Sequence, residues 1–124
     1  MKAAMAPASS NKSASGKQRE HRRFPRHRTD LPVIVNVLGQ DGYVRIHGRC
    51  NEIAESGLGA VITAELSAGE MVSLELNLPN GSQLSLRAVI RHRMGFLHGF
   101  EFVGLEREQT EPILAYCQSL PQIP

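Results

Sequence analysis

The chain has 124 residues, the size of one domain, and its 41% hydrophobic content is that of an ordinary soluble globular protein. Its charge is uneven, because residues 1–29 hold eight Lys and Arg against one Glu, whereas residues 30–124 hold six Arg against eleven Asp and Glu. No apolar run approaches the roughly 20 residues that a membrane-spanning helix needs, and residues 1–16 lack the apolar core of a signal peptide, so we expect a cytoplasmic protein.

The first part of the chain is predicted to be disordered. Residues 1–19 are rich in Ala, Ser and Lys and have no apolar periodicity, so they cannot bury enough surface to offset the entropy of ordering. We therefore divide the chain into a disordered basic tail, residues 1–19, and a folded domain, residues 20–120.

From Leu31 onward the apolar residues recur with a period close to two, which predicts strands that are buried on one face. The clearest case is Val72–Leu78, where four apolar residues alternate with three polar ones. Turn signals such as Pro79-Asn80-Gly81 separate the runs. The predicted strands are residues 31–37, 43–50, 57–63, 72–78, 83–93 and 96–103.

The last part of the chain changes period. In residues 106–119 and just beyond, apolar residues follow the i, i+3, i+4, i+7 spacing of an amphipathic helix. Pro112 lies inside this pattern and should kink or delay the helix. Six short strands followed by one helix predict an all-β fold, a small six-stranded antiparallel β-barrel whose C-terminal helix plugs one open end.

Two arginines just before the barrel form the spacing Arg-x-x-x-Arg, at Arg22 and Arg26. Pro25 biases Phe24 away from the helical region, so the two side chains lie on an extended or turning segment. From there both can reach one ligand lying against the barrel, forking onto phosphates and onto the O6/N7 edge of guanine. Taken alone, such a spacing is more often a solvated basic stretch.

The second informative stretch is Glu52–Gly59, a tight glycine turn followed by an apolar strand. Together with Arg22 and Arg26 it resembles the PilZ domain, the bacterial receptor fold for cyclic di-GMP. The resemblance covers about residues 20–118. It implies a non-catalytic signalling protein with cyclic di-GMP as its ligand, no cofactor, and a downstream protein partner that the sequence does not identify.

The resemblance also implies the site. In PilZ proteins the arginine motif grips guanine and phosphate, and a second motif, Asp/Asn-x-Ser-x-x-Gly, contacts them from the turn between the second and third strands. Here that second motif keeps only its glycine: Glu52 has a longer stem than Asp, and Ala54 lacks the hydroxyl. One lost neutral hydrogen bond costs roughly 0.5–1.5 kcal/mol, so we expect weakened binding. The implied ligand-binding residues are Arg22, Arg23, Arg26, Glu52, Ala54 and Gly57.

Catalysis and metal binding find no support in the sequence. The five histidines are scattered, and Cys50 and Cys117 form no C-x-x-C pair. Three functions stay open. The first is a cyclic di-GMP receptor in which the arginine segment orders over the barrel, and the second is a degenerate PilZ-like interaction module that no longer binds the nucleotide. The third, non-specific nucleic-acid binding by the basic arm, is disfavoured by the acidic body and the few aromatic residues.

Overall fold

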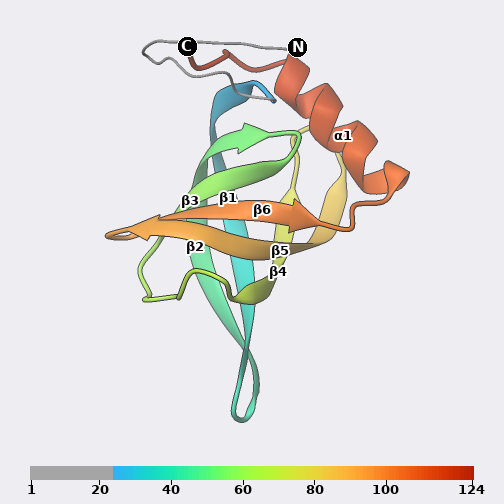
Figure 1. The fold of residues 1–124 in the computed structure, drawn as a ribbon. Coiled ribbons are helices and arrows are strands. Elements are labelled where there is room, and N and C mark those ends of the chain that lie inside the picture. The colour runs from blue at the N-terminus through green and yellow to red at the C-terminus, as the bar shows by residue number, and fades with distance from the viewer. Residues whose placement is uncertain (1–23) are drawn as a thin grey trace, which may run out of the picture.

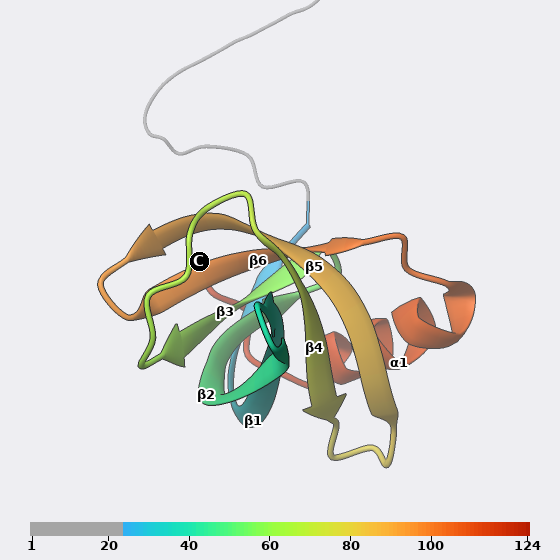
Figure 2. The ribbon, with the colours of Figure 1, turned by 90° about the horizontal axis from the view of Figure 1, so that it is seen from below.

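The computed structural model describes residues 24–124, which form a closed barrel of six antiparallel strands followed by one helix (Figure 1; Figure 2). Around the barrel the strand order is β1-β2-β3-β6-β5-β4. The fold predicted from the sequence is confirmed. Its elements are β1 (Arg26–Gly39), β2 (Gly42–Ala54), β3 (Gly57–Ile62), β4 (Met71–Asn77), β5 (Gln83–Met94), β6 (Leu97–Val103) and α1 (Arg107–Gln118).

Apolar and polar residues alternate along the strands, so the apolar side chains point inward and form one core inside the closed barrel. In β4, for example, Val72, Leu74 and Leu76 are buried, and the residues between them are less buried or exposed. The predicted turn between β4 and β5 is present, and Gly81 adopts a φ of 95° there. The core therefore collects one face of every strand and leaves the other face available for a surface site.

β1 begins five residues earlier than the sequence pattern predicted. Arg26 pairs with Ala54 and Arg28 with Glu52, ahead of a register shift between Arg28 and Leu31. Arg26 therefore lies on a strand of the barrel and not on a segment that precedes it. The run from Arg26 to Asp30 is polar and shows no alternation of apolar and polar residues. Backbone pairing, and not burial of one face, therefore holds it in the sheet.

β1 and β2 continue past the barrel as a two-stranded hairpin. β4 pairs with β1 only over Val33–Asn36, and β3 pairs with β2 only over Gly48–Ala54. The residues between these ranges extend beyond the other strands, toward the bottom of Figure 1. Three large apolar residues on this hairpin are exposed: Leu38, Tyr43 and Val44.

α1 begins before the proline that was expected to kink or delay it. Glu106 and Gln109 form a capping box, which satisfies backbone donors at the helix start. Pro112 is thus inside the helix, where it removes one intrahelical hydrogen bond but does not set the start. The buried residues Ile113, Tyr116 and Cys117 join the barrel core, so the helix packs against the barrel as predicted.

Candidate functional site

A pocket of about 430 Å³ lies on the outer face of the barrel, across β2, β3, β6 and β5. Strand pairing sets two neighbouring rows of its residues side by side. The first row runs from β1 to β6 through Arg26, Ala54, Gly57 and Glu101. The second row runs from β2 to β5 through Glu52, Gly59, Gly99 and His92.

Small residues occupy the middle of both rows, Ala54 and Gly57 in the first and Gly59 and Gly99 in the second, so the floor of the pocket carries little side-chain volume. A Cβ on Gly57 would lie 2.1 Å from the carbonyl oxygen of Phe100, which shows how closely the backbones of β3 and β6 approach. A Cβ on Gly99 would lie 2.3 Å from Nε2 of His92, so the imidazole ring covers that glycine. Gly59 leaves the floor most open, because a Cβ there would lie 3.5 Å from its nearest neighbour, Oδ1 of Asn51.

Arg26 and Glu52 form one wall of the pocket. Nη1 of Arg26 lies 2.8 Å from Oε2 of Glu52, and the two side chains are 42% and 30% exposed. Nε of Arg26 is buried and has no hydrogen-bond partner among residues 24–124. The guanidinium is therefore held in place by a carboxylate while keeping an unused donor.

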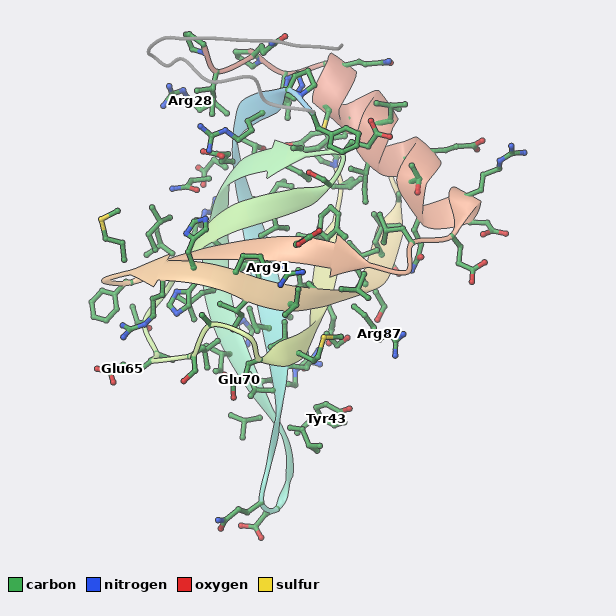
Figure 3. The ribbon with its side chains drawn as sticks, viewed as in Figure 1. Arg28, Tyr43, Glu65, Glu70, Arg87 and Arg91 are labelled. Atoms are coloured by element: carbon green, nitrogen blue, oxygen red, sulfur yellow. The ribbon has the colours of Figure 1, made fainter. Side chains whose placement is uncertain are left out.

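Arg91 and Glu101 form the opposite wall, from β5 and β6. Nε of Arg91 donates to Oε1 of Glu101, and both side chains are at least half exposed. Figure 3 shows Arg91 over the face that β5 and β6 share. His92 follows it along β5, so this wall offers a second guanidinium and an aromatic ring.

The PilZ domain model matches residues 20–119 of the chain. The chain belongs to the PilZ domain family. A search of curated proteins finds no match.

Solved structures with the same fold include other PilZ proteins. MotI/DgrA, the inhibitor of motility of Bacillus subtilis, has a TM-score of 0.64 and 21% identity over 83% of this chain and 52% of its own length. The PilZ domain of YcgR from Escherichia coli, solved with c-di-GMP, has a TM-score of 0.65 and 17% identity over 82% of this chain and 92% of its own. The PilZ domain of CeSA from a cellulose-synthesizing bacterium has a TM-score of 0.59 and 21% identity, covering 76% and 95%. This PilZ chain spans about half the length of MotI/DgrA.

The structure brings four of the predicted PilZ site residues together around the pocket: Arg26, Glu52, Ala54 and Gly57. Arg22 and Arg23 lie outside the described residues, and so does the predicted tail, residues 1–19. Phe24, which follows them directly, lines the pocket, so the chain enters the barrel at the site.

Sequence reasoning missed the half of the pocket that β5 and β6 supply. Arg91, His92 and Glu101 are far in sequence from the PilZ motifs, and strand pairing across the closed barrel brings them to the site. Two local signals existed. Gly99 interrupts a strand otherwise rich in aromatic residues, and such a glycine marks a close approach. The second signal concerns the other half of the pocket: Ser56, between β2 and β3, carries a hydroxyl two residues after Ala54 and also lines the pocket.

The histidines and cysteines of the described residues form no group that could hold a metal ion. Among residues 24–124, no three His, Cys, Asp or Glu side chains gather as metal ligands, and no helix has the length and hydrophobicity to cross a bilayer. His92 pairs with Gly99 and not with His98, whose ring is fully buried. Burial raises the pKa of Cys50 to about 12 and that of Cys117 to about 11, so both stay protonated thiols near neutral pH.

Proposed function

We propose that this PilZ domain is a regulatory receptor that binds cyclic di-GMP and catalyses no reaction. The observation that carries the proposal is Arg26, whose guanidinium stands at the edge of a pocket floored by glycines. A guanidinium fork matches phosphate oxygens and the O6/N7 edge of guanine, and a floor of small residues lets a flat base approach the sheet. The PilZ domain of YcgR, which has the same fold, was solved with this dinucleotide.

In this proposal the arginines that precede the barrel close over the ligand. Arg22 and Arg23 directly precede Phe24, which lines the pocket, so a dinucleotide beside Arg26 lies within their reach. Binding then orders the arginine segment over the barrel surface. The surface offered to a downstream protein changes without any chemical step.

Glu52 competes with the ligand for Arg26. Ion pairs between exposed side chains contribute only about 0–1 kcal/mol, and this pair is partly exposed. Hydrogen bonds from a guanidinium to a charged phosphate contribute about 1.5–3 kcal/mol. The ligand therefore outweighs Glu52, although the competition lowers its affinity, and we expect binding in the micromolar range or weaker.

Calorimetric titration with cyclic di-GMP tests the proposal. Arg26→Ala should weaken binding by about 1.5–3 kcal/mol, or roughly 10- to 150-fold. Arg45→Ala is the matched control, because Arg45 also pairs with a carboxylate, Glu75 at 2.9 Å, and does not line the pocket. If Arg26→Ala binds as tightly as the unsubstituted protein, the dinucleotide site lies elsewhere.

One observation favours a second function. The Glu52 carboxylate already pairs with Nη1 of Arg26, and Ala54 leaves the second motif without its hydroxyl. Both features suit a PilZ-like module that works through protein contacts and has lost the nucleotide. Absence of any titration signal with the unsubstituted protein would put this alternative first.

A further inference from the structure

We propose that the segment after α1, Leu120–Ile123, positions Arg26 for ligand binding by pairing with the strand that carries it. This inference rests on the proposed nucleotide site and adds a part of the chain that lies outside both motifs. We call Leu120–Ile123 the post-helix segment. In Figure 1 it is the red stretch beyond α1, which passes beside the blue start of β1.

Backbone hydrogen bonds join the post-helix segment to the arginine strand. The Ile123 amide donates to the Arg26 carbonyl oxygen at 2.7 Å, and the Arg28 amide donates to the Pro121 carbonyl oxygen at 3.0 Å. Between them, His27 and Gln122 form an isolated antiparallel bridge. On its other edge the same stretch pairs with β2, where Arg26 faces Ala54. Arg26 therefore sits on the middle strand of a local three-stranded arrangement.

Side chains tie the same stretch to α1. Nδ1 of His27 lies 3.3 Å from the Leu120 carbonyl oxygen, which accepts from it. The hydroxyl groups of Thr29 and Tyr116 hydrogen-bond to each other. Every residue from Arg26 to Thr29 thus contacts a residue of α1 or of the post-helix segment, through backbone or side chain.

This pairing matters for binding because the start of β1 lacks the apolar alternation that anchors a strand to a core. Arg26, His27 and Arg28 are polar, and the register shifts just after them. A peptide held on two edges is pre-organised, whereas one held on a single edge must be ordered by the ligand at a cost in affinity. By linkage, a ligand that grips Arg26 must also stabilise the post-helix segment.

Three substitutions in the full chain separate the backbone bond from other effects. Ile123→Pro removes the N–H that donates to Arg26. Ile123→Ala loses the side chain but keeps that N–H. Gln122→Pro is the proline control, because the Gln122 amide makes neither of the two hydrogen bonds between the strands. Those two bonds lie on either side of the His27–Gln122 bridge.

We expect Ile123→Pro alone to weaken cyclic di-GMP binding, by about fivefold or more, with circular dichroism unchanged. In this variant the Arg28 amide should lose protection from solvent exchange and the NMR signal of the Arg26 Nε–H should shift, while both controls keep the protection and the shift of the unsubstituted protein. In an Arg26→Ala background, Ile123→Pro should have no further effect on binding, because the segment acts through Arg26. An equal loss in that background would assign the segment a general structural role and overturn the proposal.

The two proposals fail in different ways. If the unsubstituted protein binds no cyclic di-GMP, the proposed function falls, and the NMR comparison still decides whether the segment positions Arg26. If Ile123→Pro leaves the Arg28 amide as protected as before and the Arg26 Nε–H signal unshifted, the positioning role is refuted whatever the nucleotide does.

Discussion

Glu52 and Ala54 are where this PilZ domain departs from the motif of its family, and the structure gives each departure a physical meaning. The Glu52 carboxylate reaches Arg26 and holds it at 2.8 Å. Ala54 faces the same pocket with a methyl group, and it is nearly buried between Arg26 and Gly57 in its row. One residue thus engages the guanidinium from within the protein, and the other offers a ligand no hydrogen bond.

Restoring both residues should therefore tighten cyclic di-GMP binding. In the double variant Glu52→Asp, Ala54→Ser, the shorter aspartate side chain forms a weaker ion pair with Arg26. The serine hydroxyl adds one hydrogen bond to the ligand. The hydroxyl contributes about 0.5–1.5 kcal/mol and the weakened ion pair about 0–1 kcal/mol, and calorimetric titration measures the sum. Glu75→Asp, which shortens the carboxylate of the off-site Arg45 pair, is the control. No gain in the double variant would mean that this end of β2 does not contact the ligand.

Two glycines of the pocket floor, Gly57 and Gly99, exclude a side chain for different reasons. A Cβ on Gly57 would meet backbone atoms, the carbonyl of Phe100, whereas a Cβ on Gly99 would meet only the His92 ring. Backbone of a closed barrel cannot move without disturbing neighbouring strands, but an exposed side chain can rotate away.

We therefore expect Gly57→Ala to lower the free energy of unfolding by about 1–3 kcal/mol and Gly99→Ala to lower it by clearly less. Urea denaturation of both variants measures the difference. Adding His92→Ala to Gly99→Ala should recover most of the smaller loss, since it removes the clashing ring. Equal losses for the two alanine variants would contradict this account of the floor.

The strands β4 and β5 could be predicted from the sequence almost to the residue, whereas β2 was predicted to end at Cys50 and continues to Ala54. The predicted strand at 72–78 is β4, Met71–Asn77, and the predicted strand at 83–93 is β5, Gln83–Met94. The start of β1 could not be predicted, because Arg26–Arg28 is held by pairing with β2 and with the post-helix segment, and pairing leaves no pattern in side chains.

The candidate site divides in the same way. Arg26, Glu52, Ala54 and Gly57 stand in motifs that are read along the chain. The wall formed by Arg91 and Glu101 arises only when β5 and β6 close the barrel beside β3. A closed sheet puts residues about 40 positions apart in one row, and a pattern read along the chain does not report such rows.

For the molecule as a whole, the separation of charge suggests a test of the nucleic-acid alternative. Residues 1–29 hold eight of the fourteen Lys and Arg. Contacts between such an arm and phosphates release counterions, so binding to DNA or RNA should be weak and should collapse between about 50 and 200 mM salt.

Deleting residues 1–19 should abolish that weak binding and leave cyclic di-GMP binding in place, because Arg22, Arg23 and Arg26 remain. Fluorescence anisotropy with a labelled oligonucleotide, beside calorimetry with the dinucleotide, measures both. Loss of dinucleotide binding on the same deletion would move the site into the arm. Nucleic-acid binding that resists salt would place nucleic-acid binding ahead of cyclic di-GMP binding as the function of this protein.

The β1–β2 hairpin gives the molecule a projection whose tip lies outside the strand pairing of the closed barrel. Its outer residues pair only with each other among the described strands, and its tip projects past the barrel (Figure 1). Figure 3 shows Tyr43 on this projection, at a distance from Arg91 in the pocket wall. The tip at Gln40 and Asp41 does not line the pocket, so it offers a place to insert a fluorescent reporter domain while the pocket stays whole.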